Sequence, residues 1–211
     1  MAASNCRIRP SPARLPPDAS AALYRPEYAA ALNLLARACA MLKRRGLALP
    51  ILVGGAVVEF DTAGQIHSGD FDLVSVADGE LSEALLAVGF LTEDRPGIKR
   101  GGFYHPTLPI GVEFVSGGYF EGQADRQRIR VIPFAEGEVL MAATEDLIAD
   151  RLGQWIASDR RDTELLIQAQ TMFHIAESIA TDYLDQRIRQ DTAGNLTLAE
   201  FLSLGPEAHH P

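Results

Sequence analysis

The stretch Val53-Gly-Gly-Ala-Val-Val-Glu-Phe-Asp-Thr-Ala-Gly-Gln-Ile-His-Ser-Gly-Asp-Phe-Asp-Leu-Val74 decides the fold. A short apolar segment ends at the paired glycines Gly54 and Gly55, which predicts a buried strand ending in a tight turn. A short helix is expected over residues 56–60. The segment 70–76 alternates polar and apolar residues over its first half and predicts a second strand. The chain is therefore expected to form a strand, turn, helix and strand in close succession.

Two aspartates of this stretch give the first chemical signal. Residues two apart on a strand point to the same side, so Asp70 and Asp72 are expected to project together while Phe71 enters the apolar layer. Two carboxylates at close range repel each other unless a cation lies between them, and Mg²⁺ takes such oxygen ligands. Aspartates also begin turns and cap helices, and the preceding Ser68-Gly69 suits that structural role. The pair alone leaves both interpretations open.

Two further features point to a ligand site. At Gly54-Gly55 the missing side chains would let a phosphate approach the backbone, and the N-terminus of the following helix offers free N–H groups. Glu113 lies inside the apolar segment 110–115, where an ionised carboxylate is unfavourable unless it is paired or bound to a metal. An edge strand that leaves Glu113 in water is the alternative.

A basic pair precedes a second glycine pair in the strand-rich middle of the chain. Lys99 and Arg100 stand before Gly101-Gly102, so they are the cations best placed to meet a phosphate that glycine lets approach. The same residues also suit a solvated hairpin turn. Both interpretations stay open at this stage.

The rest of the chain frames this region. Residues 1–20 hold four prolines and predict an extended or disordered arm. Residues 21–142 predict a core with an amphipathic helix over 27–45 and a mixed or antiparallel sheet. Residues 143–211 predict a helical C-terminal part, in which Thr144 is the expected N-cap of the first helix. Together these elements predict a mixed α/β (α+β) fold, with a sheet flanked by helices.

Composition excludes several classes of protein. The chain has 211 residues, of which 47% are hydrophobic and 22% charged, as expected for a globular protein. Nineteen basic and 28 acidic residues give a net charge of -9, which argues against broad nucleic-acid binding. The two cysteines are far apart, and the chain has neither a secretory signal nor a membrane-spanning run. A cytoplasmic protein without a membrane partner is therefore expected.

The glycine pair, the Asp-Phe-Asp strand and the later acid together resemble the nucleotidyltransferase superfamily with the polymerase-beta-like fold. More narrowly, they are similar to the small bacterial branch that includes AbiEii-like abortive-infection and toxin–antitoxin proteins. The resemblance covers about residues 27–175 and is sharpest at Gly54-Gly55 and at 68–73. The chain departs from many relatives in having Gly-Gly in place of Gly-Ser, and Ile66 where AbiEii-like members often carry an arginine.

The resemblance implies which residues form the site. The glycine motif would contact the nucleotide phosphates, the paired aspartates would hold one or two Mg²⁺ or Mn²⁺ ions, and a third carboxylate would complete the site. By position, the metal and catalytic roles fall on Asp70, Asp72 and Glu113, and nucleotide binding falls on Gly54, Gly55 and Ser68, with Lys99 and Arg100 as further phosphate contacts. Glu121 and Asp125 are the alternatives for the third carboxylate.

The implied activity is transfer of a nucleoside monophosphate from an NTP to a hydroxyl group of a protein, a small molecule or an RNA end. The partners are then the NTP, an unknown acceptor and a possible protein partner. A rival interpretation is a catalytically silent protein of the same fold that binds or regulates, such as a toxin–antitoxin component. A third is a structural domain whose acids only cap turns.

Overall fold

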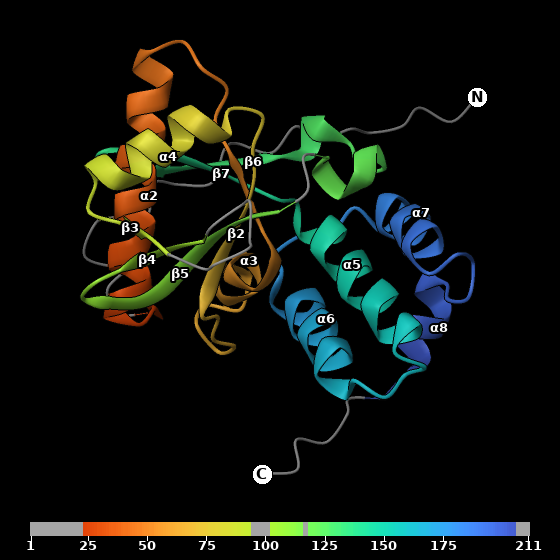
Figure 1. The fold of residues 1–211 in the computed structure, drawn as a ribbon. Helices are drawn as coiled ribbons and strands as arrows, with labels where there is room; N and C mark the ends of the chain where they lie inside the picture. Colours follow the sequence, from red (N-terminus) through yellow and green to blue (C-terminus); the bar gives the residue numbers. More distant parts are fainter. Residues whose placement is uncertain (1–22, 94–101, 116–117, 206–211) are drawn as a thin grey trace.

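The computed structural model describes residues 23–93, 102–115 and 118–205. These residues form a seven-stranded mixed sheet with helices packed on it, which confirms the predicted mixed α/β class. Figure 1 shows the sheet with α2 and α4 on one side and the helices α5 to α8 gathered at the other. The predicted arm, residues 1–20, and the basic pair at 99–100 lie outside the described residues.

Helix α2 (Pro26–Arg44) packs against the sheet and against α4. Pro26 suits the first turn of a helix, where its missing N–H would have no partner, and Glu27 and Arg44 lie at the ends that favour their charges. One face of the helix is buried, including Tyr28 and Leu35. The helix predicted over 27–45 is therefore confirmed to within one residue at each end.

The predicted strand, helix and strand are also confirmed. They are β1 (Ile51–Val53), α3 (Gly54–Asp61) and β2 (Asp70–Val74). However, α3 begins at Gly54 directly after β1, so the glycine pair lies in the first turn of the helix and not in a separate turn. Strand β2 is antiparallel to β1 and parallel to β5 (Leu108–Val115), so it lies between two neighbours near the middle of the sheet. Its burial alternates at the start, with Phe71 inward and the aspartates outward.

The remaining elements complete the sheet in the order β3-β4-β5-β2-β1-β7-β6. Strands β1 and β7 are parallel, whereas the β3–β4, β4–β5 and β6–β7 pairs are antiparallel. The elements are α4 (Asp78–Ala87), β3 (Leu91–Thr92), β4 (Phe103–His105), the 3-10 turns η1 (Tyr119–Gly122) and η2 (Arg126–Arg128), β6 (Arg130–Phe134) and β7 (Gly137–Met141).

The C-terminal helices are α5 (Thr144–Ala157), α6 (Thr163–Ile175), α7 (Thr181–Asp191) and α8 (Leu198–Ser203). Helix α5 packs against α6 and α7, and α3 contacts both the sheet and α5 and α6 (Figure 1). Helix α3 therefore lies where the sheet meets the helical layer. Among the described residues, no helix is long and apolar enough to cross a membrane.

The prediction that Thr144 caps α5 is wrong. The N-cap is Ala143, and Thr144 is the first helical residue. Its hydroxyl donates to the Asp61 carboxylate at 2.8 Å instead of to its own helix. A tertiary partner has replaced the local capping bond that the sequence pattern favours.

A buried polar network joins α5 to α7. Arg187 is 0% exposed, and its Nε donates to Asp146, which is also fully buried, at 2.8 Å. The Tyr119 hydroxyl of η1 donates to the same carboxylate. Because Arg187 also binds Asp191 through two hydrogen bonds, the charges of this network are paired. The network fixes η1 against the helical layer, beside the cavity described below.

Candidate functional site

Three predicted carboxylates come from adjacent positions of neighbouring strands. Asp72 of β2 pairs in register with Glu113 of β5, and Asp70 pairs with Gly111. Residues opposite each other in two paired strands project to the same face, as do residues two apart on one strand. All three acids therefore lie on one face of the sheet. Asp70 and Glu113 are exposed, whereas Asp72 is half-buried.

Glycines make room for these side chains. Gly54 has φ +67°, a conformation that L side chains rarely adopt, and a Cβ built on it would overlap Asp72 Oδ2. A Cβ on Gly111 would likewise overlap Asp70 Oδ1. A Cβ on Gly55 would lie 2.8 Å from Ser68 Oγ. The glycine pair thus lets the turn approach the acids closely; its contact with a nucleotide phosphate stays a prediction.

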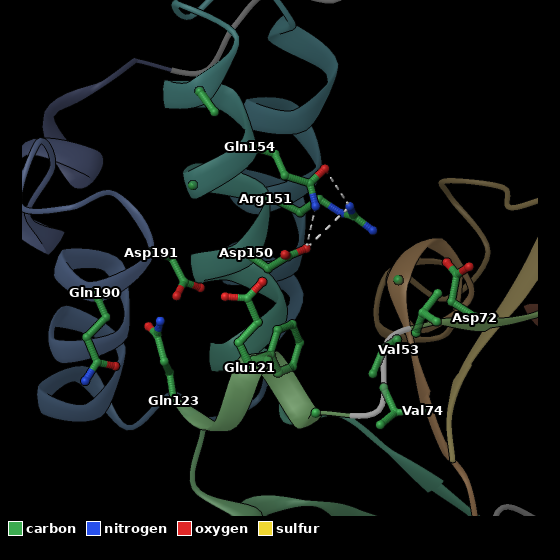
Figure 2. A pocket seen from close by; sticks show the side chains of 16 residues that line it. Val53, Asp72, Val74, Glu121, Gln123, Asp150, Arg151, Gln154, Gln190 and Asp191 are labelled. Carbon is green, nitrogen blue, oxygen red and sulfur yellow. Dashed lines mark hydrogen bonds and ion pairs between the residues drawn. The ribbon is translucent and has the colours of Figure 1, made fainter. Parts of the chain in front are cut away.

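A cavity of about 540 Å³ opens beside Asp72, between the sheet and the helical layer. Gly54 and Asp72 form one wall, and α5 forms the opposite wall through Asp150, Arg151 and Gln154 (Figure 2). Asp70 and Glu113 are not among the lining residues, so the two exposed acids lie beside the cavity. The remaining described residues that line it come from β1, β2, β5, the η1 segment, α5 and α7: Val53, Val74, Val115, Gly118, Phe120, Glu121, Gln123, Gly153, Ala157, Gln190 and Asp191.

Arg151 is a candidate site residue that no sequence motif identifies. It is 9% exposed, and its guanidinium points from α5 toward the wall that carries Asp72 (Figure 2). It donates to Gln154 at 3.2 Å and forms an ion pair of 3.5 Å with Asp150, while its Nε is buried without a hydrogen-bond partner. The signal in the sequence is a charged residue at a core-facing position of an apolar helical stripe.

Burial raises the pKa of the Asp72 carboxyl to about 6, and the negative charges of Glu113 and Asp70 add to the effect. The Arg151 charge acts in the opposite direction. An ordinary aspartate ionises near pH 3.8; burial is the main cause of the difference, and the excess of negative charge from Glu113 and Asp70 adds to it. A cation placed among these acids would relieve that excess.

The far end of the cavity is also acidic. Asp150, Asp191 and Glu121 point into it (Figure 2). Burial raises the pKa of Asp150, although Arg151 and Gln154 partly oppose this. Burial also raises the pKa of Asp191, to about 6, against the lowering effect of Arg187. A substrate in this cavity would meet carboxylates at both ends and one guanidinium between them.

The site fits a divalent cation in its chemistry but does not hold the ligands in a closed arrangement. Asp70, Asp72 and Glu113 supply the hard oxygen donors that Mg²⁺ and Mn²⁺ prefer, and the charges of Glu113 and Asp70 contribute, after burial, to the raised pKa of Asp72. In the part of the chain that the structure describes, no group of three His, Cys, Asp or Glu side chains is close enough to hold a metal as it stands. The exposed side chains of Asp70 and Glu113 would have to turn toward the ion.

The two alternatives for the third carboxylate are placed differently. Glu121 lines the cavity on the side of the helical layer, at φ +54° in the strained η1 turn. Asp125 caps η2, where its carboxylate accepts from the Gln127 N–H at 2.9 Å. Of the three candidates, Glu113 is the one that pairs in register with Asp72.

Ser68 and Ile66 have clear structural surroundings. The Ser68 hydroxyl donates to the Asp70 carbonyl at 3.0 Å and faces Gly55. Ile66, at the position where AbiEii-like proteins often carry arginine, packs against the apolar core. A guanidinium nevertheless reaches this turn from another element, because Arg25 donates to the Ser68 carbonyl.

Comparison with solved structures gives a match to an antigenic nucleotidyltransferase-like protein from Paracoccidioides brasiliensis. The TM-score is 0.58 over 81% of this chain and 88% of that chain, at 14% sequence identity. The chain has a nucleotidyltransferase-like fold. At this identity the match concerns the fold alone. No family model matches the chain, and no curated protein is similar to it in sequence.

Proposed function

We propose that the protein is a Mg²⁺-dependent nucleotidyltransferase that transfers a nucleoside monophosphate from an NTP to a hydroxyl acceptor. One observation carries the proposal: Asp70, Asp72 and Glu113 share one face of the sheet, beside a cavity whose opposite wall presents Arg151. The nucleotidyltransferase-like fold supports it. Acids that only capped turns would have no need to gather at such a cavity.

Each part of the site has a role in this reaction. Asp70, Asp72 and Glu113 would hold the divalent cation, which when bound supplies Lewis-acid stabilisation of the phosphate and acceptor oxygens. Arg151 would neutralise and orient phosphate oxygens, because a guanidinium offers several donors in one plane. The N–H groups at the start of α3 would receive phosphate at the glycine turn.

The bond changes are those of an in-line displacement at the α phosphorus. The acceptor oxygen forms a bond to phosphorus as the bond to pyrophosphate breaks, and the hydroxyl proton passes to a carboxylate or to water. The chain's own residues mainly position the reactants and offset charge. The acceptor is a protein side chain, a small molecule or an RNA end, and the net charge of -9 makes RNA the least favoured of these.

Incubation with each labelled NTP, with Mg²⁺ or Mn²⁺ and with cell extract tests the proposal. We expect a labelled product with the unchanged protein, and none with Asp70→Asn or Asp72→Asn. Asp159→Asn is the matched control, because its carboxylate is 79% exposed on the turn before α6. Equal labelling by the unchanged protein and both site variants would refute the assignment of the carboxylates.

A catalytically silent binding or regulatory protein is the second candidate, and one observation favours it. The described acids do not form a closed metal site as they stand. This candidate predicts NTP binding without any labelled product under the conditions above. Membership of the AbiEii-like toxin–antitoxin branch also remains a proposal, for which co-purification of a partner protein is the test.

A further inference from the structure

An ion pair between a half-buried arginine and a fully buried glutamate lies at the turn that leads into strand β2. Glu59 of α3 is 0% exposed, and its two carboxylate oxygens accept from Arg25 Nε and Nη2 at 2.9 Å each. Arg25 is the residue before Pro26, at the start of α2. Neither residue lines the cavity. A fully buried carboxylate is unfavourable unless it is paired and hydrogen-bonded, so this arrangement needs both partners in place.

The ion pair is built around the main chain of Ser68. The Ser68 N–H donates to Glu59 Oε2 at 2.7 Å, and the Ser68 carbonyl accepts from Arg25 Nη2. Both main-chain groups of this residue are thus satisfied by charged side chains from two other elements. Hydrogen bonds to charged groups are about twice as strong as those between neutral groups. The turn is therefore anchored by α2 and α3 together.

Anchoring this turn fixes the start of the aspartate strand. Ser68 Oγ donates to the Asp70 carbonyl at 3.0 Å, and the next residue, Gly69, accepts from the Gly111 N–H at 3.0 Å, where β2 begins to pair with β5. Glu59 lies one helical turn after Gly55, so both face the same side of α3. Ser68 Oγ faces the same side of the helix, because a Cβ built on Gly55 would lie 2.8 Å from it.

We infer that Arg25 and Glu59 are positioning residues for the proposed nucleotidyl-transfer site. They hold the Ser68-Gly69 turn so that Asp70 is presented to the cation beside Asp72. The inference rests on the proposed function for its catalytic meaning, but the anchoring itself is a property of the chain alone. Partners of this kind, which orient ligands without touching the ion, change metal affinity by roughly 10- to 100-fold when they are altered.

The test compares this pair with a second pair on the same helix. Arg25→Lys keeps the charge but loses the fork that spans Glu59 and Ser68, and Glu59→Gln keeps the shape but loses the charge. Arg130→Lys is the matched control, because Arg130 binds Asp61 of α3 through two hydrogen bonds of 2.6 and 3.0 Å and does not contact Ser68. All three variants are made in the full chain.

Three measurements are made on each variant: hydrogen exchange of the Ser68 and Asp70 amides by NMR, the dissociation constant of Mn²⁺ by electron paramagnetic resonance, and the melting temperature. We expect Arg25→Lys and Glu59→Gln to speed exchange of these amides by about 10-fold or more and to weaken Mn²⁺ binding by roughly 10- to 100-fold. Arg130→Lys should change neither the exchange of these amides nor the dissociation constant of Mn²⁺, even if its melting temperature falls as much as that of the other two variants.

Two results would overturn the inference. One is unchanged exchange at Ser68 and Asp70 in Arg25→Lys. The other is a Mn²⁺ affinity that falls equally in Arg130→Lys, in proportion to lost stability. If the unchanged protein binds no Mn²⁺, the proposed function fails instead, and the exchange measurement alone decides whether the pair anchors the turn. Should Glu59→Gln not fold, Arg25→Lys carries the test.

Discussion

Replacing Asp72 with asparagine should stabilise the protein near neutral pH while removing its proposed function. The pKa of Asp72 is raised from 3.8 to about 6, first by burial and then by the charges of Glu113 and Asp70. At 1.36 kcal/mol for each pKa unit, this difference corresponds to about 3 kcal/mol. Asp72 is only half-buried, so solvent screening reduces the expected effect to about 1–2 kcal/mol.

The direction of the pH dependence follows from which state of the protein, folded or unfolded, binds the Asp72 proton more tightly. Because the pKa is higher in the folded protein, the folded state keeps its proton at a pH where the unfolded state has lost it. This contribution to stability is fully present below pH 3.8 and is lost as the pH rises through about 6. Above that range the ionised Asp72 carboxylate destabilises the folded state. The asparagine side chain of the variant would stay neutral at every pH and would avoid this loss of stability.

Thermal unfolding measured by circular dichroism at about pH 7.5 and about pH 4.5 checks this prediction. Asp72→Asn should melt about 2–8 °C higher than the unchanged protein at the higher pH, and the difference should shrink at the lower pH. Excess Mg²⁺ should stabilise the unchanged protein and not the variant. Asp159→Asn, at an exposed carboxylate, is the control. A variant that is less stable at both pH values would refute the reasoning.

Four further changes test other parts of the structure. Gly54→Ala should lower the free energy of unfolding, measured in urea, by about 1–3 kcal/mol. The reason is that φ of Gly54 is +67° and that the new Cβ would displace the Asp72 carboxylate. Arg151→Gln should weaken NTP binding in titration calorimetry. It should also raise the pKa of Asp72 further, because the charge of Arg151 lowers that pKa in the unchanged protein. Lys99→Ala combined with Arg100→Ala should raise the dissociation constant for NTP, and unchanged titrations would remove both from the site. Arg187→Ala should cost about 3–5 kcal/mol and lower the melting temperature by at least about 6 °C, because it leaves a buried carboxylate unpaired.

Local patterns predicted the elements that carry the aspartates. The apolar spacing and the charges at its ends predicted α2, and the apolar segment before Gly54 predicted β1. Alternation over Asp70 to Leu73 predicted which side chains of β2 face outward. Each of these signals lies within one continuous helix or strand, so the sequence alone could show them.

Long-range pairing could not be predicted in this way. The register that sets Glu113 opposite Asp72 depends on two strands about 40 residues apart in sequence, and no local pattern encodes it. Arg151 lies at the cavity only because α5 packs against α3. Likewise, Arg25 reaches Ser68 across a separation of 43 residues. These placements follow from how the layers pack, which a single sequence does not display.

The origin of the two cavity walls has a consequence for specificity. Strand β2 supplies Asp72 and the start of α3 supplies Gly54, whereas Asp150, Arg151 and Asp191 come from helices after Met141. Under the proposed function, substitutions in those helices would therefore alter which molecule enters the cavity and would leave the acids on the sheet in place. Under the proposed function, the acids that would hold the cation and the guanidinium that would meet the substrate thus come from separate segments of the chain and meet only in the folded molecule.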